Sequence, residues 1–145
     1  MMYWRRPLTR LEAALYGCLL AVFVGVFARS MAGYMEAAER LAMQATLINT
    51  TAAINVRRFQ GLSDWQRRNP FELSGATPPN FVKGGDPASM ESGQWTFDIE
   101  QAELVYLPRL RLTLQTSDGQ NVLRFRLIQG PRGYSLEPKA PFVWG

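Results

Sequence analysis

The chain has 145 residues, and its 16 lysines and arginines exceed its 12 aspartates and glutamates by a formal net charge of +4. A chain of this length forms one modest domain plus appendages, and a charge this small is no sign of nucleic-acid binding. The sequence contains no histidine, which removes the commonest general base and metal ligand. It also lacks a Gly-x-Ser-x-Gly motif and a phosphate-binding glycine loop. We therefore expect no enzyme, and no cofactor or metal site.

An apolar run near the N-terminus predicts a membrane anchor. Residues 13–28 contain no charged side chain, and a helix over this run covers about 24 Å. Arg10 and Arg29 can extend their charged ends to the two interfaces of a bilayer. Three arginines precede the run, so the positive-inside rule predicts a cytoplasmic N-terminus and the bulk of the chain on the other side. A cleavable signal peptide ending at Ser30-Met31-Ala32 is the alternative, which the charge of Arg29 disfavours.

The helical pattern continues beyond this run. No proline occurs between Arg29 and Pro70, and apolar residues keep a spacing of three or four. The residues of this apolar stripe are Met35, Ala38, Leu41, Ala45, Ile48, Ala52, Val56 and Phe59. Such a period predicts one long helix that turns the stripe toward a core and pairs Glu36 with Arg40 on the solvent side. The N-terminal part of the chain is thus predicted to comprise a basic leader (1–7), a membrane-embedded half-helix (8–33) and an amphipathic half-helix (34–60).

The predicted start of the helix carries a Thr-x-x-Glu capping box, formed by Thr9 and Glu12. In such a box each of the two side chains accepts a hydrogen bond from the backbone amide of the other residue. A second interpretation of Glu12 is that a carboxylate at the membrane edge pairs with a positive group on a neighbouring chain. Gly17, Gly25 and Gly33 recur every eight residues. They either allow close approach of a second helix or are simply tolerated in a membrane helix.

The rest of the chain is predicted to be a loop-rich connector followed by a β-sheet domain. Residues 61–93 are rich in proline and glycine, which argues against long regular elements. In residues 94–145 the apolar period changes to two, which indicates strands. The predicted strands begin at Trp95, Glu103 and Gly133, with a hairpin over residues 109–128 between the last two, and Phe142, Val143 and Trp144 are predicted to pack as a tail.

The clearest hairpin is predicted within residues 109–128, with Asp118-Gly119 as its two-residue turn. Its register sets three apolar pairs opposite one another, namely Leu114 and Leu123, Leu112 and Phe125, and Leu110 and Leu127. The other face would then carry Arg109, Arg111, Arg124 and Arg126, which either bind a partner or only solubilise the sheet. These patterns together predict an α+β fold. A long N-terminal helix covers a four- to five-stranded antiparallel sheet through the apolar stripe.

With these elements the chain resembles type IV pilins and type II secretion pseudopilins. Arg5 and Arg6 match the basic leader of those proteins, and Leu8-Thr9-Arg10-Leu11-Glu12 matches the start of their mature helix. The stretch "RNPFELSGATPPNF", followed by "GQWTFDIEQAELVYLPR", also resembles pilin-like proteins. The resemblance implies that Glu12 pairs with the N-terminal amine of a neighbouring subunit. It implies processing by prepilin peptidase at Pro7–Leu8, although Pro7 stands where the family carries glycine or alanine.

The function that the resemblance implies is a structural or assembly subunit of a type IV pilus, a type II secretion machine or a related filament machine. Its expected partners are other pilin-like subunits or inner-membrane assembly proteins, together with the lipid bilayer. Its expected location is the bacterial inner membrane, with the C-terminal domain in the periplasm. The alternative is a stand-alone bitopic adaptor of the inner membrane, whose sheet domain binds a protein partner.

Overall fold

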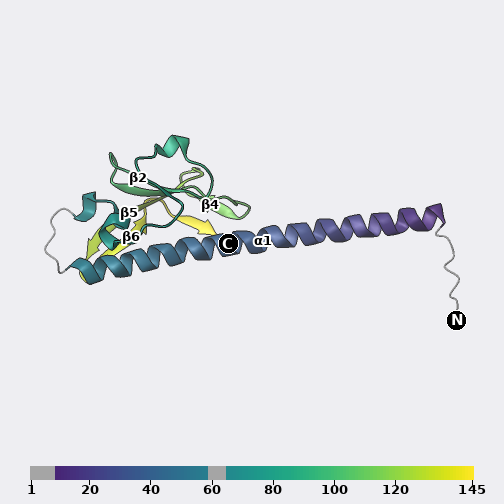
Figure 1. The fold of residues 1–145 in the computed structure, drawn as a ribbon, viewed down its shortest axis with the longest axis horizontal. Helices are drawn as coiled ribbons and strands as arrows, with labels where there is room; N and C mark the ends of the chain where they lie inside the picture. Colours follow the sequence, from purple (N-terminus) through teal and green to yellow (C-terminus); the bar gives the residue numbers. More distant parts are fainter. Residues whose placement is uncertain (1–8, 59–64) are drawn as a thin grey trace. The chain divides into compact units, whose positions relative to one another are not determined.

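A computed structural model describes residues 9–58 and 65–145 of the chain. The helices and strands, in chain order, are α1 (Arg10–Arg57), the short 3-10 helix η2 (Trp65–Arg67), α2 (Pro70–Ser74), β1 (Phe81–Val82), the 3-10 helix η3 (Pro87–Ser89), β2 (Trp95–Asp98), β3 (Glu103–Tyr106), β4 (Leu114–Thr116), β5 (Leu123–Gly130), β6 (Gly133–Pro138) and β7 (Phe142–Trp144) (Figure 1). Contacts divide the chain into two compact units, Met1–Met35 and Glu36–Gly145. We call the second of these the globular unit.

The first unit consists of the N-terminal part of α1. Every side chain from Arg10 to Met31 is exposed, although most of them are apolar. An all-round apolar helix is stable only where lipid or other helices cover it. By length and composition, α1 is the one helix among the described residues that could cross a membrane, a property that it shares with signal sequences.

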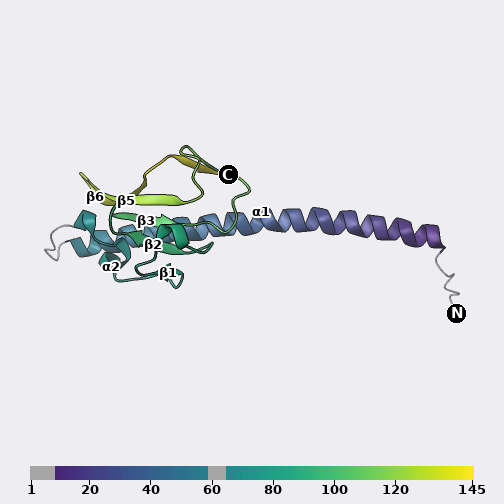
Figure 2. The same cartoon turned by 90° about the horizontal axis from the view of Figure 1, so that it is seen from above.

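The globular unit contains a mixed five-stranded sheet that packs on the C-terminal part of α1 (Figures 1 and 2). The strand order is β1-β2-β3-β5-β6, and the neighbours are antiparallel except for β1 and β2, which are parallel. The α+β class and the long N-terminal helix are therefore confirmed, whereas the fully antiparallel sheet is a wrong prediction. The cause is the long path from β1 to β2, which includes η3 and lets the chain re-enter the sheet in the same direction.

The predicted hairpin within residues 109–128 does not form. Both edges of β5 are occupied, by β3 on one side and by β6 on the other, so no edge remains for β4. Instead β4 pairs with the C-terminal strand β7 in a separate two-stranded sheet, which places Leu114 opposite Trp144. The turn chemistry at Asp118-Gly119 is nevertheless present, because Gly119 has φ +68° and the Asp118 carboxylate accepts a hydrogen bond from the Gln120 amide.

The face of α1 that packs on the sheet is also not the predicted one. Within the globular unit, the buried residues of α1 are Glu36, Met43, Thr50 and Ile54. The predicted stripe points away, since Leu41, Ile48 and Val56 are 60%, 68% and 76% exposed. Phe59, the last residue of the predicted stripe, lies outside the described residues. The apolar spacing predicted the wrong face of α1, because two of its four buried residues, Glu36 and Thr50, are polar.

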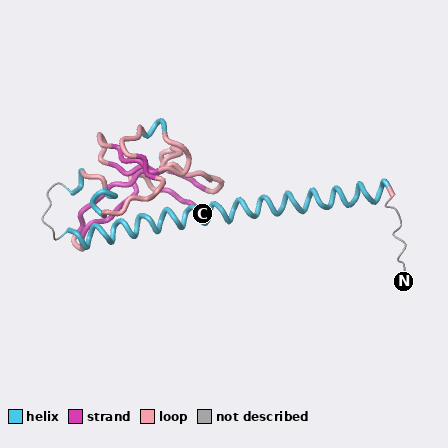
Figure 3. Tube along the Cα trace, in the orientation of Figure 1, coloured by secondary structure: helices cyan, strands magenta, loops and turns pink. Residues whose placement is uncertain are grey.

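The core of the globular unit is largely aromatic. The Trp95 ring lies 4.5 Å from the Tyr106 ring, 5.5 Å from the Phe71 ring and 6.1 Å from the Phe125 ring, measured between centroids. A second cluster joins Ile54 of α1 to Trp65, Leu73 and Leu127. Between residues 65 and 93 the regular elements are short, and loops, pink in Figure 3, make up much of the unit. Their buried aromatic residues nevertheless hold them against the core.

We expect Ile54→Ala to lower the free energy of unfolding by about 2–5 kcal/mol, because Ile54 is fully buried and truncation leaves a cavity. The matched change Ile48→Ala, six residues earlier on the exposed face, should alter it by less than about 0.5 kcal/mol. Urea unfolding of the detergent-solubilised chain, followed by tryptophan fluorescence, measures both. Equal effects of the two changes would contradict the packing of α1 described above.

Candidate functional sites

The capping box at the start of α1 is formed as predicted. The Thr9 amide donates to Glu12 Oε2 at 2.8 Å, and the Glu12 amide donates to Thr9 Oγ1 at 3.3 Å. Both residues are exposed, so the Glu12 carboxylate remains accessible to a neighbouring chain. The cap satisfies amides that a helix start otherwise leaves without partners. The ion pair with a neighbour stays a prediction, and Pro7 and Leu8 of the predicted processing junction lie outside the described residues.

The three glycines of the apolar helix face open space. A Cβ atom placed at Gly17, Gly25 or Gly33 would meet nothing within 4 Å beyond the helix's own nearby backbone. Nothing in the described part of the chain therefore requires glycine at these positions. Close approach of a second helix and simple tolerance both stay predictions.

The four arginines of the predicted partner-binding face do not share one sheet face. Arg124 and Arg126 lie on β5, whereas Arg109 and Arg111 lie between β3 and β4, in a segment without helix or strand. The register that grouped them is not formed, and Arg126 lies opposite Glu137 of β6. The grouping of the arginines into one binding face was therefore wrong, because it depended on the hairpin.

Arg124 and Arg126 bind a buried carboxylate within the chain. Glu103, fully buried at the start of β3, forms ion pairs with Arg126 at 2.7 Å, Lys139 at 3.0 Å and Arg124 at 3.3 Å. Arg124 also contacts Asp98 at 3.1 Å. Burial by itself would raise the pKa of Glu103, but the hydrogen bonds from Lys139 and Arg126 outweigh burial and hold this pKa below its usual value. Neither Asp98 nor Glu103 was among the site residues that the sequence predicted.

A second polar cluster joins the C-terminal part of α1 to the rest of the globular unit. It consists of Glu36, Glu39 and Arg40, which we call the helix clamp. Glu36, 3% exposed, accepts hydrogen bonds from the Thr113 amide and from Trp144 Nε1, both at 2.9 Å. The Arg40 guanidinium donates to the carbonyl oxygen of Trp144. Glu36 and Arg40 therefore both engage the C-terminal strand, and the predicted solvent-side pair between them was wrong.

Glu39 of the helix clamp binds the segment that follows β3. Its carboxylate accepts from the Tyr106 hydroxyl at 2.7 Å, the Arg109 amide at 2.6 Å and the Leu110 amide at 3.0 Å. Burial, and then the hydrogen bond to Glu39, raises the pKa of Tyr106, so the phenol stays protonated as a donor. Burial would raise the pKa of Glu36, but the Thr113 amide and the Trp144 indole lower it below its usual value.

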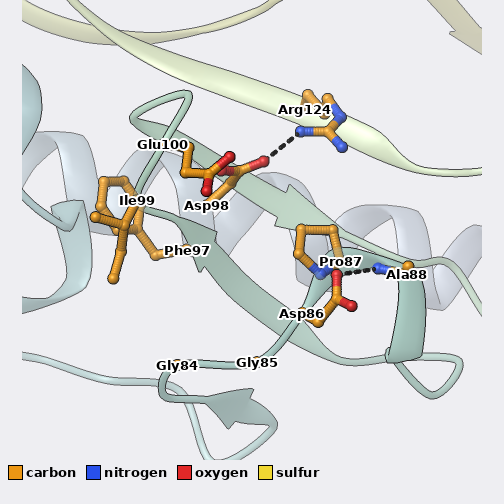
Figure 4. Close-up of a pocket in the computed structure, with 10 residues that line it drawn as sticks. All are labelled: Gly84, Gly85, Asp86, Pro87, Ala88, Phe97, Asp98, Ile99, Glu100 and Arg124. Atoms are coloured by element: carbon orange, nitrogen blue, oxygen red, sulfur yellow. Dashed lines mark hydrogen bonds and ion pairs between the residues drawn. The ribbon is translucent and has the colours of Figure 1, made fainter.

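An open cavity of about 630 Å³ lies on the globular unit between the loop at residues 84–88 and the end of β2 (Figure 4). Three acidic residues line it, of which Asp86 and Asp98 are engaged within the chain and Glu100 is exposed. The Asp98 carboxylate contacts Arg124, and the Asp86 carboxylate accepts from the Ala88 amide at 2.9 Å. Among the described residues, no group of three His, Cys, Asp or Glu side chains could hold a metal ion. The cavity therefore presents no set of free groups that defines a chemistry.

Comparison with protein-family models, curated proteins and solved structures finds no match for this chain.

We expect Glu103→Gln to lower the free energy of unfolding at neutral pH by about 1–3 kcal/mol, because three cations lose their shared anion while water still reaches the half-exposed Arg126 and Lys139. The folded-state pKa of Glu103 lies below its unfolded value of about 4.3, so the stabilisation is complete above that value and is lost as pH falls through the folded-state pKa. The variant should therefore lose less stability on acidification than the parent chain does.

Urea unfolding between neutral and acidic pH measures this difference. The control is Glu100→Gln, which removes an exposed carboxylate from the adjoining turn and leaves the Glu103 ion pairs in place. If Glu103→Gln and Glu100→Gln gave the same pH profile, the ion-pair cluster would not be the source of the acid sensitivity.

Proposed function

We propose that this chain is a pilin-like, membrane-anchored subunit with a structural or assembly role in a type IV pilus, a type II secretion machine or a related filament machine. It assembles through α1. The proposal includes a place in the bacterial inner membrane, with the N-terminus in the cytoplasm and the globular unit in the periplasm. The distribution of arginines around the apolar run supports this orientation.

The observation that carries the proposal is the apolar stripe on the outer face of α1 within the globular unit. Leu41, Ile48 and Val56 are more than half exposed, although the same helix segment already packs a different face on its own sheet. A single-pass anchor needs apolar surface only inside the bilayer. Burying one such side chain against a partner contributes about 1.5–3 kcal/mol to the free energy of association. A partner helix that covered this stripe would therefore be bound more tightly.

The composition of the stripe suits a helical partner. Ala38, Ala45 and Ala52 lie between the larger apolar residues and are also exposed. Small residues let two helix backbones approach closely, and large residues on either side then interlock. Other pilin-like subunits, or assembly proteins with a similar helix, are the partners that fit such a surface.

Glu12 supports the same proposal at the start of the helix. Its carboxylate is exposed, and in the free chain it caps α1. In an assembly this carboxylate would instead neutralise a positive group of a neighbouring subunit, which the resemblance suggests is the N-terminal amine released by cleavage at Pro7–Leu8. When Glu12 leaves the cap, the helix loses the free energy of about one capping interaction. An ion pair in apolar surroundings can offset this loss.

The alternative function, a stand-alone adaptor that binds a protein through its arginine face, has less support. Arg124 and Arg126 are held by Glu103 within the chain, so only Arg109 and Arg111 of the original four lack an ion-pair partner among the described residues. The apolar stripe also has no role in that alternative.

We expect Glu12→Ala to abolish incorporation into the assembly, because the carboxylate that sets the register between subunits is lost. Thr9→Ala is the matched control, since it also breaks the capping box but keeps the carboxylate, and it should leave incorporation largely intact. Recovery of the assembled complex from cells that lack the parent chain measures both. Normal recovery with Glu12→Ala would contradict the role proposed for this residue.

A photo-crosslinking residue at position 48 should yield products with the helix of another pilin-like subunit in the native membrane, because Ile48 lies at the centre of the exposed stripe. The same residue at position 99 is the control, since Ile99 is 76% exposed but lies in the turn after β2. Mass spectrometry identifies the partner peptides. Crosslinks of equal yield from both positions would contradict assembly through the stripe.

A further inference from the structure

The segment that connects β3 to β4 is held by three of its backbone amides, by the buried Pro108 and by the Thr113 hydroxyl, which donates to the Gly145 carbonyl oxygen at 3.3 Å. We call residues 107–113, "LPRLRLT", the clamped loop. The amides of Arg109, Leu110 and Thr113 donate to the Glu39 and Glu36 carboxylates of the helix clamp. The side chain of Arg109 lies against Gly93, where an added Cβ atom would meet its Nε. Arg109 and Arg111 are exposed, and so is Leu112, at 67%.

The clamped loop lies at the end of the globular unit where the chain enters from the apolar helix. Glu36 is the first residue of the globular unit, and its carboxylate is 2.9 Å from the Thr113 amide. Arg29, the one charged residue between positions 13 and 35, precedes Glu36 by seven positions. The chain therefore keeps these two residues within about 25 Å of each other even when extended, and closer where it is helical. This places the loop within reach of the surface of any bilayer that α1 enters.

The charges at this end of the globular unit favour an anionic partner. Within the described part of the chain, neither Arg109 nor Arg111 forms an ion pair. Arg40 adds a third positive charge on the adjacent helix turn, and it donates to the Trp144 carbonyl. The carboxylates of the helix clamp, Glu36 and Glu39, are occupied by hydrogen bonds from the unit itself. They therefore leave the exposed guanidinium groups of Arg109 and Arg111 without an ion pair to the clamp.

We propose that the clamped loop binds the anionic lipid surface of the membrane that α1 enters, with Arg109 and Arg111 on lipid phosphates and Leu112 in the interfacial layer. A planar guanidinium matches the geometry of phosphate oxygens and binds them with two parallel hydrogen bonds. An exposed leucine between cations gains when it leaves water for the boundary between headgroups and acyl chains. The inference depends on the membrane anchoring that forms part of the proposed function, but not on assembly with other subunits.

Such a contact would give the globular unit a second attachment to the membrane besides α1. A unit tethered only by one helix can take many orientations, whereas a second contact restricts them. The helix clamp makes this possible, because its carboxylates determine where the arginines are presented. Lipid binding by the clamped loop would therefore orient the exposed stripe of α1 before any partner arrives.

The test uses the full chain, purified and reconstituted alone into vesicles of phosphatidylcholine or of an equal mixture of phosphatidylcholine and phosphatidylglycerol. In a Cys18→Ser background, a fluorescent label is placed on Leu112→Cys or, as a control, on Ile99→Cys. Ile99 is 76% exposed, against 67% for Leu112, but it follows the C-terminal end of β2. The other end of that strand, at Trp95, pairs with Tyr106, whose hydroxyl donates to Glu39 of the helix clamp. A nitroxide on the lipid headgroups reports proximity by quenching.

We expect strong quenching at position 112 in the mixed vesicles, weak quenching at position 99, and loss of the difference in high salt. Each arginine near an anionic surface shifts a local binding equilibrium by about fivefold, so the double change Arg109→Gln and Arg111→Gln should lower it by about 25-fold. The matched control, Arg67→Gln with Arg68→Gln, removes the same charge from an exposed turn elsewhere and should leave the quenching unchanged.

Three results would overturn the inference, and the third has wider consequences than the first two. Equal quenching at positions 112 and 99 in a chain that stays with the vesicles, or an equal loss with the Arg67 and Arg68 changes, would exclude the lipid contact and leave the assembly role untouched. Extraction of the chain from the vesicles by alkaline carbonate would remove the membrane anchor, and with it both this inference and the proposed function.

Discussion

The arrangement of the globular unit depends on the hydrogen bonds that the buried carboxylate of Glu36 accepts. A charge with 3% exposure is tolerated only where hydrogen bonds replace its water, and both donors come from segments far along the chain, Thr113 and Trp144. The C-terminal strand must therefore be in place before the Glu36 carboxylate has both of its hydrogen-bond donors. Arg40 strengthens the same dependence, since it donates to the Trp144 carbonyl. The first and last segments of the globular unit thus stabilise each other.

This polar attachment explains why α1 has an apolar face to spare. The helix contacts its own sheet through Met43 and Ile54, but also through Glu36, Thr50 and the amide of Asn55, which exchanges two 2.8 Å hydrogen bonds with the backbone of Tyr134 on β6. Those two bonds occupy the backbone of an edge strand that would otherwise invite pairing with another chain. Because polar contacts do part of the packing inside the unit, the apolar stripe remains available on the outside, where it supports the proposed assembly role.

The two carboxylate clusters divide the arginines into those that serve the fold and those that face outward. Glu103 binds Arg124 and Arg126, and desolvation of this carboxylate makes the ion pairs obligatory. The helix clamp, by contrast, engages the amides of the clamped loop and leaves the guanidinium groups of Arg109 and Arg111 outside. The charges of Arg109 and Arg111 thus remain exposed at the end where the chain enters from the apolar helix. The carboxylates of the helix clamp therefore serve both the fold and the proposed membrane contact.

The sequence by itself determined the features that depend on neighbouring residues. These are the long helix, the capping box of Thr9 and Glu12, the strands at Trp95 and Glu103, and the turn at Asp118-Gly119, because propensity, capping and turn conformation are local properties. Only the tertiary structure decided which face of α1 is buried, which strand pairs with β4, and where Arg109 and Arg124 point. Each of these depends on competition between distant segments. An aromatic C-terminal strand displaced the predicted hairpin, and buried carboxylates with distant donors outweighed the more apolar face of the helix.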